Sequence, residues 1–321
     1  MAEFRKVNTL RWAALVTASV YLNTACAPAI SPQVMDSVVS VLPDWPDRRA
    51  RGNGVRAKSP EGTAVAVLPG GYLATNVHVI RNAEKVRIRF EDGRIIPVEV
   101  VGRDRPTDIA LMKAPMELPV PESGVVPGIG DKVCAIGNQF GLGLSVSCGV
   151  ISAVARTGTG FNTIEDFIQT DAAVNPGGSG GALIDDHSRL VGLVSAIFTK
   201  ESDANVGVNF ASSMRLVRRV VTDLRDHGRV LRGNPGLTTG KLSAERLQRG
   251  GGAVVIQIER GSGAFKTGLQ AGDIITAVGE RRVRNSADFT AEVHMYRPGE
   301  IVEITFTHAG KQSKISFQLP P

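Results

Sequence analysis

A serine enclosed by glycines is the first feature of this chain that could do chemistry. Within residues 169–183, Ser179 has two glycines on each side. Glycine tolerates backbone angles that a side chain forbids, so a tight turn here can aim several N–H groups at one point. A nucleophilic serine needs such donors, because an oxyanion forms when it attacks a carbonyl. We predict an oxyanion loop of Gly177, Gly178 and Ser179, with the N–H groups of Gly177 and Ser179 as donors. The alternative is an ordinary serine in a glycine-rich turn.

Such a serine needs a base, and the base needs an orienting group. His78 lies between two apolar runs in residues 71–80, and Asp108 opens the apolar run that follows it. Each also has a simpler interpretation. His78 could be a packed core histidine, and Asp108 could cap a helix or a strand. An unpaired carboxylate at such a place would be costly to bury, however. The order His78, Asp108, Ser179 is also the order of the chymotrypsin arrangement.

Four segments together resemble the HtrA (DegP/DegS-like) serine proteases. They are Thr75–Ile80, Thr107–Leu111, Ala135–Leu142 and Asn175–Leu183. Gln139 stands where that family usually has proline. The resemblance covers about residues 32–320 and implies a mainly β fold, a chymotrypsin-like double β-barrel protease followed by one PDZ domain. It also implies the catalytic residues His78, Asp108 and Ser179.

This resemblance and the composition divide the chain into three parts. We expect an export signal or membrane anchor in residues 1–30, the protease domain in 31–228, and a linker with the PDZ domain in 229–321. His78 and Asp108 belong to the first half of the protease region and Ser179 to the second. The site is therefore expected between two barrels, each of which supplies part of it.

Short apolar runs with period-two alternation, separated by turn residues, are typical of barrels and sandwiches. They predict strands over 37–41, 64–68, 86–90, 95–101, 132–136, 145–154, 164–170 and 190–197. Apolar residues at helical spacing predict a helix over 211–228, ended by Gly228.

The N-terminus looks like an export address. Arg5, Lys6 and Arg11 precede the apolar run 12–22, which is too short to span a bilayer unless it is extended toward residue 30. Cys26 follows a sequence that is somewhat similar to a lipoprotein cleavage site. Cleavage, lipidation at Cys26 and an uncleaved anchor all remain open. Each places the catalytic part outside the cytoplasm, in the periplasm or on the extracytoplasmic face of the membrane.

The chain is basic, with a formal net charge of +6 and a pI of about 9.4. The basic residues are scattered, without interleaved aromatic residues that could stack bases, so we expect no nucleic-acid partner. Cys134 and Cys148 flank the turn of a predicted hairpin and could pair, although a free buried cysteine is the commoner outcome. No Cys or His grouping has metal-ligand spacing, so we expect no metal and no cofactor.

The resemblance also points to a specificity pocket. Proteases of this fold that cut after Lys or Arg have Asp six residues before the serine, where this chain has Ala173. By resemblance, Val174, Ile197 and Phe198 wall the pocket and favour small or medium aliphatic side chains. The alternative is that these three residues are plain core packing.

The C-terminal region resembles a PDZ domain in residues 261–275, with strands expected at 253–258, 301–307 and 313–318 and a helix near 286–294. PDZ domains take an extended peptide as an added strand and hold its carboxylate in a backbone nest. We expect this nest at Asn234, Pro235, Gly236 and Leu237, where Pro235 lacks one N–H donor. A PDZ domain used only for packing or assembly is the alternative.

Together these features predict an exported, ATP-independent serine endopeptidase that cleaves misfolded or regulatory envelope proteins and is regulated by peptides at its PDZ domain. The resemblance implies a homotrimer, and the N-terminus could anchor the chain to the membrane. The runner-up interpretation is a catalytically silent PDZ-containing chaperone or peptide-binding scaffold.

Overall fold

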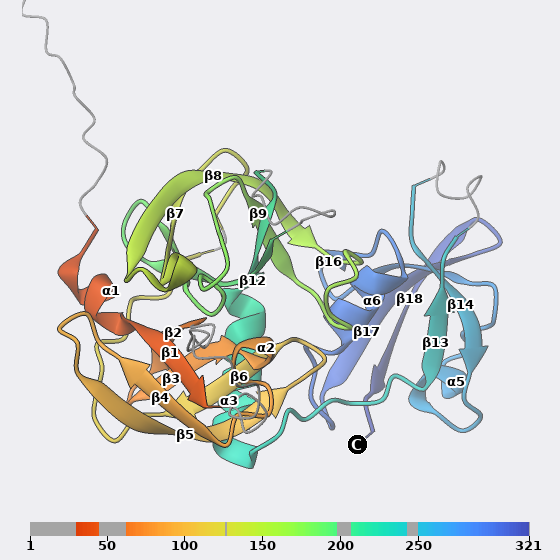
Figure 1. The fold of residues 1–321 in the computed structure, drawn as a ribbon. Helices are drawn as coiled ribbons and strands as arrows, with labels where there is room; N and C mark the ends of the chain where they lie inside the picture. Colours follow the sequence, from red (N-terminus) through yellow and green to blue (C-terminus); the bar gives the residue numbers. More distant parts are fainter. Residues whose placement is uncertain (1–29, 45–61, 126, 198–206, 243–249, 321) are drawn as a thin grey trace, which may run out of the picture.

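The computed structural model describes residues 30–44, 62–125, 127–197, 207–242 and 250–320 (Figure 1). The described part is mainly β, with two closed barrels followed by a separate smaller sheet. This confirms the fold class that we expected. The predictions for residues 1–29, Cys26 included, lie outside the described residues. Within the described ranges, no helix has the length and apolar character needed to cross a bilayer.

The first barrel follows the alternating pattern of residues 38–113. Around the barrel its strands are β1 (Val38–Asp44), β2 (Gly62–Leu68), β3 (Tyr72–Asn76), β6 (Ile109–Lys113), β5 (Ile95–Asp104) and β4 (Lys85–Arg89). A short helix, α1 (Pro32–Ser37), precedes β1, and one helical turn, α2 (Val77–Ile80), follows β3. Leu73, Ile88 and Met112 are fully buried inside this barrel. The alternation therefore separates an inner apolar face from an outer one, as the strand period requires.

The second barrel has the same layout. Around it the strands are β10 (Ala182–Asp185), β11 (Leu190–Ile197), β12 (Asn209–Ser213), β9 (Phe167–Thr170), β8 (Ser145–Arg156) and β7 (Lys132–Gly137). The β7–β8 connection contains a 3₁₀ turn, η2 (Gln139–Gly141). The strand register places Cys134 opposite Cys148, and the two form a disulfide. The free cysteine that we considered the commoner outcome is therefore not what the structure has.

The helix α3 (Met214–His227) packs against both barrels. Its apolar face, which includes Val217 and Val220, is buried in the cluster that joins them. Ser213 caps the N-terminus by accepting the Leu216 N–H, and Gly228 ends the helix with φ of 68°. Our predicted helix began too early. Residues 211–213 extend β12 instead, because their backbone pairs with β11 and β9.

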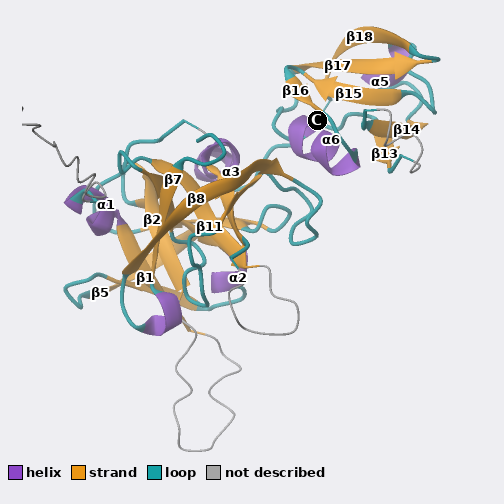
Figure 2. Cartoon of the chain, turned by 90° about the horizontal axis from the view of Figure 1, so that it is seen from above, coloured by secondary structure: helices purple, strands orange, loops and turns teal. Residues whose placement is uncertain are grey.

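The C-terminal sheet lies beside the barrels, in teal to dark blue in Figure 1 and apart from them in Figure 2. Its strands run in the order β13 (Leu237–Gly240), β14 (Ala253–Ile258), β15 (Ile274–Val278), β17 (Ile301–His308) and β18 (Lys311–Gln318), with β16 (Arg281–Arg282) paired to β15. The helices α5 (Gly263–Lys266) and α6 (Ser286–Val293) complete this unit. It has its own core, in which Ile275, Val302 and Leu319 are buried.

The disulfide generates the first prediction. It closes a loop with a sequence separation of 14, and cross-linking a loop of about 15 residues stabilises a protein by about 3 kcal/mol. We expect Cys134→Ser/Cys148→Ser to lower the free energy of unfolding by about this amount, as measured by urea denaturation. Reductant should lower the parent equally and leave the double variant unchanged. Equal midpoints for the two proteins would contradict the prediction.

Candidate active site

His78 and Asp108 lie together at the rim of the first barrel. His78 belongs to α2, and its Nδ1 is 2.5 Å from Asp108 Oδ2, while its backbone N–H donates to Asp108 Oδ1 at 2.9 Å. An ionised carboxylate can only accept, so Nδ1 carries the proton and Nε2 is free to act as a base. The side chain of His78 is 42% exposed and that of Asp108 17%. The imidazole of His78 therefore faces solvent while the carboxylate of Asp108 is largely covered.

Ser179 comes from the second barrel, in the loop between β9 and β10. Its hydroxyl donates to the Ser195 carbonyl at 3.3 Å. The Gly178 N–H is already bonded to the Asn175 carbonyl at 2.9 Å. In contrast, the N–H groups of Gly177 and Ser179 have no acceptor among the described residues. Of the predicted oxyanion loop, these two residues can donate to a substrate oxygen, and Gly178 serves to shape the turn.

Only glycine fits at Gly177. Its φ is 96°, and a Cβ there would lie 2.3 Å from the carbonyl oxygen of Asn138. Side chains are disfavoured at such a φ and excluded at such a distance. The preceding carbonyl, that of Pro176, accepts the Phe140 N–H at 2.6 Å. Because C=O and N–H point in opposite directions across a trans peptide, this contact turns the Gly177 N–H away from the β7–β8 connection.

A cavity of about 490 Å³ opens beside His78. It is lined by His78 and Asp108, by Phe161 and Asn162 of the β8–β9 connection, and by Ser195 of β11. Both barrels thus contribute walls to it. Within the described ranges, no three His, Cys, Asp or Glu side chains gather as metal ligands would.

Three residues at this site were not identified from the sequence, namely Asn76, Ser195 and Thr63. Asn76 is fully buried and donates from Nδ2 to the Asp108 carbonyl at 3.1 Å and to Ser195 Oγ at 3.4 Å. Thr63 in β2 is fully buried and reaches the serine loop through its hydroxyl. All three have polar side chains in or beside apolar strands, and a buried polar group needs a partner. That signal was present in the sequence, but it did not identify the partners.

Gln139 takes part in shaping the serine loop. Its Nε2 donates to the Ala173 carbonyl at 3.3 Å, and its Oε1 accepts from Asn175 Nδ2 at 2.7 Å. Gln139 therefore bridges two points of the segment that precedes Ser179. The proline expected from the family resemblance could not make either contact.

The predicted specificity pocket is only partly described. Val174 is 3% exposed and belongs to the core of the second barrel. Ile197 ends β11, but its side chain is not described, and Phe198 lies outside the described residues. The three residues are thus not shown to form one pocket, and their role stays a prediction.

The predicted carboxylate nest precedes β13. Pro235 has no N–H, and the Gly236 N–H donates to Asn234 Oδ1 at 2.9 Å within the loop itself. Leu237 is 6% exposed and packs in the core of the C-terminal unit. The loop accordingly has fewer N–H groups free for a carboxylate than its length implies. β13 is nevertheless an edge strand of its sheet, where a peptide could be added.

Comparisons with known proteins identify the family and the two domains. The trypsin-like peptidase domain model matches residues 62–193, and the PDZ domain model matches residues 220–319. The solved structure of the HtrA-type protease AlgW with a tripeptide is 33% identical, with a TM-score of 0.71, and the match covers 90% of this chain and 94% of that one. The chain belongs to the HtrA family.

Curated HtrA relatives are longer. A probable periplasmic serine protease do/HhoA-like of Haemophilus influenzae is 36% identical over 259 residues, which is 78% of this chain and 55% of that protein. The periplasmic serine endoprotease DegP of Escherichia coli K12 is 34% identical over 259 residues, 78% of this chain and 54% of that protein. The chain therefore spans about half the length of the curated relatives it matches.

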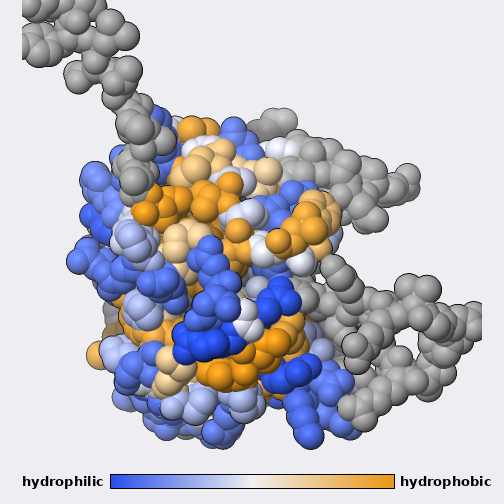
Figure 3. All heavy atoms as spheres, turned by 60° about the vertical axis from the view of Figure 1, so that its left-hand side comes forward, coloured by the Kyte–Doolittle hydropathy of each residue, from blue (hydrophilic) through white to orange (hydrophobic). Residues whose placement is uncertain are grey.

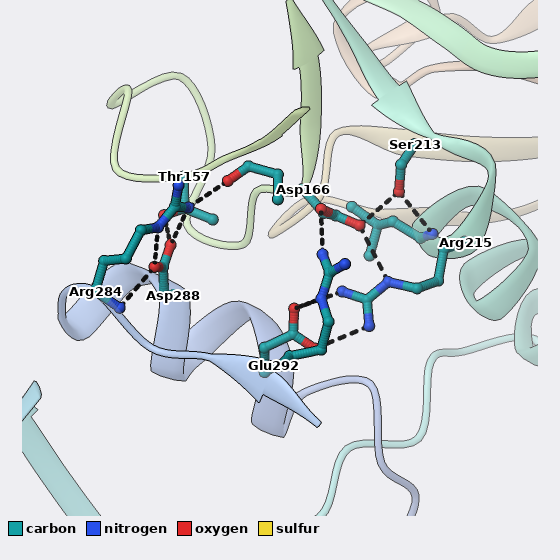
Figure 4. A network of polar contacts seen from close by, with 10 residues as sticks. Thr157, Asp166, Ser213, Arg215, Arg284, Asp288 and Glu292 are labelled. Carbon is teal, nitrogen blue, oxygen red and sulfur yellow. Dashed lines mark hydrogen bonds and ion pairs between the residues drawn. The ribbon is translucent and has the colours of Figure 1, made fainter. Parts of the chain in front are cut away.

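In this HtrA chain, charged side chains connect the PDZ domain to the second barrel (Figure 4). Arg215 of α3 donates to both oxygens of Glu292 in α6, at 2.8 and 2.7 Å, and to Asp166 at 3.2 Å. Arg281 of β16 also donates to Glu292, at 3.2 Å. Ser213 donates to Asp166 at 2.6 Å. Asp166 and Glu292 are 4% and 7% exposed, so each buried carboxylate is matched by a guanidinium.

A second group of contacts lies at the start of α6. Asp288 is 3% exposed, and it accepts from Thr157 of the second barrel and from Arg284, at 2.6 Å. Burial alone would raise the pKa of Asp288, but the hydrogen bonds from Arg284 and Thr157 hold this pKa below its usual value. The Asp288 carboxylate is therefore ionised at neutral pH. It connects the PDZ domain to the second barrel through its hydrogen bond with Thr157.

A third contact lies at the linker between the domains. Arg232 donates to Asp104 of β5 at 2.9 and 2.6 Å. His294 follows α6 close to this pair, and its Nδ1 is buried without a hydrogen-bond partner among the described residues. Burial, and then the charge of Arg232, lower the pKa of His294 to about 4, while Asp104 opposes them. The packed interface therefore holds His294 in its neutral form.

This histidine makes stability depend on pH. Above about pH 6.5 it is neutral in both the folded and the unfolded chain. Between pH 6.5 and 4 only the unfolded chain binds the proton, so stability falls as the pH is lowered. We expect His294 to contribute a loss of about 2 kcal/mol between pH 7.5 and 5. Urea denaturation at both pH values should show a smaller loss for His294→Gln than for the parent. The same loss in both proteins would refute the assignment.

Proposed function

We propose that this HtrA chain is an ATP-independent serine endopeptidase of the cell envelope. The observations that carry the proposal are the hydrogen-bonded Asp108–His78 pair and the Ser179 loop, in which two N–H groups lack an acceptor among the described residues. The family supports the same activity, since the curated relatives are named as periplasmic serine proteases. The reaction is hydrolysis of a peptide bond through an acyl-enzyme.

Each member of the triad has one role. Ser179 Oγ leaves its contact with the Ser195 carbonyl, transfers its proton to His78 Nε2 and attacks the substrate carbonyl. Asp108 fixes the tautomer of His78 and stabilises the imidazolium that forms. His78 then protonates the leaving amine, and a water molecule hydrolyses the acyl-enzyme by the same route in reverse.

The negative charge that develops on the substrate oxygen is stabilised by the N–H groups of Gly177 and Ser179. Removing one such donor in a serine protease costs about 3 kcal/mol of transition-state stabilisation. The two donors are worth this much because the loop already holds them in place before the substrate binds. Gly178 contributes by keeping its own N–H bonded to Asn175.

Substrates of this site are unfolded or misfolded exported proteins, or a regulatory membrane protein. Ala173 removes the negative charge that a preference for Lys or Arg would need, and Val174 gives the pocket region apolar character. With Ile197 and Phe198, we propose a pocket for small or medium aliphatic side chains. Discrimination between such side chains is modest, about 1–3 kcal/mol per methylene.

The activity is tested by cleavage of unfolded casein. We expect the parent to cleave it and Ser179→Ala to lose at least about 10⁴-fold in rate, because the nucleophile is removed while the fold is retained. Circular dichroism should give both proteins the same spectrum. If neither protein cleaves, and a fluorophosphonate fails to label Ser179 in the parent, the chain acts as a peptide-binding scaffold instead.

We also propose that a peptide bound at the PDZ domain raises protease activity. A peptide added to the edge strand β13 would lie beside α6, whose first residue, Ser286, contacts Thr239 of β13. The opposite face of the same helix carries Asp288 and Glu292, which bind the protease. Since Asp166 directly precedes β9, the ion pairs connect α6 to the strand that leads into the serine loop.

This regulation is tested with Arg215→Met and a pool of decapeptides that have randomised C-terminal residues. We expect the pool to raise casein turnover by the parent, and the ratio of rates with and without it to fall toward 1 in the variant, because Glu292 and Asp166 lose their shared guanidinium. Arg225→Met is the matched control. Arg225 lies on the same helix and pairs with Asp226 on the surface. Equal ratios in all three proteins would contradict the coupling.

The remaining parts of the proposal rest on resemblance and composition. We propose the domain limits 31–228 and 229–321, and export or membrane attachment through residues 1–30. A homotrimer is the family expectation. Figure 3 shows apolar patches, in orange, among polar surface on one side of the barrels, and such patches often accompany contact surfaces.

A further inference from the structure

Thr63 contacts the serine loop from the other barrel. It lies near the start of β2, is fully buried, and belongs to no catalytic motif. Its hydroxyl accepts the Asn138 N–H at 2.9 Å and donates to the Gly177 carbonyl at 2.7 Å. Its own N–H donates to the Ser179 carbonyl at 2.9 Å. One residue of the first barrel therefore binds the loop at the nucleophile and at an oxyanion donor.

We propose that Thr63 is a positioning residue that holds the oxyanion loop in its donor geometry. The inference rests on the proposed endopeptidase function. It concerns the orientation of two peptide groups, those on either side of Gly177.

The peptide after Gly177 is held directly. Its carbonyl accepts from the Thr63 hydroxyl, and its N–H, that of Gly178, donates to the Asn175 carbonyl. The C=O and the N–H of this peptide group are thus both held by hydrogen bonds. Because the group is planar, it can rotate only if both bonds break. Glycines on both sides make rotation easy where such contacts are lost.

The peptide before Gly177 is held through the β7–β8 connection. The Pro176 carbonyl accepts from Phe140, which follows Asn138 by two residues, and the Asn138 N–H is bonded to the Thr63 hydroxyl. If this peptide rotated, the Pro176 carbonyl would replace the Gly177 N–H at the site. An acceptor would then face the oxyanion where catalysis needs a donor.

A hydroxyl suits this place because one group both accepts and donates. Valine has nearly the same shape but can do neither, so the Thr63 hydrogen bonds to the Asn138 N–H and the Gly177 carbonyl would be lost. The loop then gains by turning these groups toward water. Serine keeps the hydroxyl and loses only a methyl group. The two substitutions therefore separate hydrogen bonding from packing.

The test compares Thr63→Val and Thr63→Ser in the full chain, with a fluorogenic peptide taken from a casein site that the parent cleaves. We expect kcat of Thr63→Val to fall about 10²-fold, the order of effect seen when an oxyanion donor is lost, with KM changed less than about 3-fold. Thr63→Ser should stay within about 3-fold of the parent in kcat. Labelling of Ser179 by a fluorophosphonate should slow in parallel with kcat.

Ser37→Ala is the control. Ser37, the last residue of α1, is another fully buried hydroxyl, and it donates to the Val34 carbonyl at 2.6 Å within that helix. We expect it to lower the thermal midpoint without changing kcat. Thr63→Ala, which removes the hydroxyl without adding bulk, replaces Thr63→Val if that variant loses its cooperative thermal transition.

The outcomes are distinct. A parent that cleaves, together with a folded Thr63→Val or Thr63→Ala of unchanged kcat, would overturn the role of Thr63 and leave the endopeptidase intact. An equal loss of kcat in Thr63→Ser would also overturn it, because packing rather than the hydroxyl would then matter. A parent that neither cleaves nor is labelled would overturn the proposed function, and this inference with it.

Discussion

Two backbones meet with no side chain between them where the second barrel touches the first. A Cβ on Gly180 would lie 2.0 Å from the Thr63 carbonyl oxygen and 2.5 Å from Thr75 Oγ1, so only glycine allows the approach. The Thr63 N–H can then reach the Ser179 carbonyl. This contact fixes the position of the serine loop against the first barrel, which carries His78. The glycines around Ser179 therefore serve the docking of the barrels as well as the turn.

The three proposed catalytic residues could be singled out in the sequence because their types are rare in their surroundings. Each of the residues His78, Asp108 and Ser179 interrupts a local pattern in which it has no evident structural role. The family resemblance grouped the three together. Thr63 and Ser195 could not be assigned in this way. A hydroxyl in an apolar strand shows that a partner exists, but the partner is a backbone group more than a hundred residues away for Thr63, and only the fold brings the two together.

The secondary-structure elements could also be predicted only in part from the sequence. Alternation identified most strands of both barrels, since each has one face inside. The helix α3 was placed three residues too early because Ser212 and Ser213 have polar side chains that suit a helix start, whereas their backbones pair with two neighbouring strands. The pairing of Cys134 and Cys148 depended on register. A shift of one residue in the β7–β8 hairpin would have moved the two side chains to opposite faces.

The domain interface contains buried ion pairs where a purely structural contact could be apolar. Buried ion pairs are weak evidence for stability, since well-packed apolar residues often stabilise as much, but breaking one pair is costly. Glu292 and Asp288 lie four residues apart on α6 and so face one side of that helix, toward the protease. Ser286, at the start of the helix, faces β13 instead. A rigid helix cannot shift one face without shifting the other. If a peptide bound beside β13 displaced this helix, the geometry at Arg215 would change with it. The directional hydrogen bonds of a guanidinium respond to such a shift more steeply than an apolar contact would, which is a physical reason for ion pairs to join the two domains.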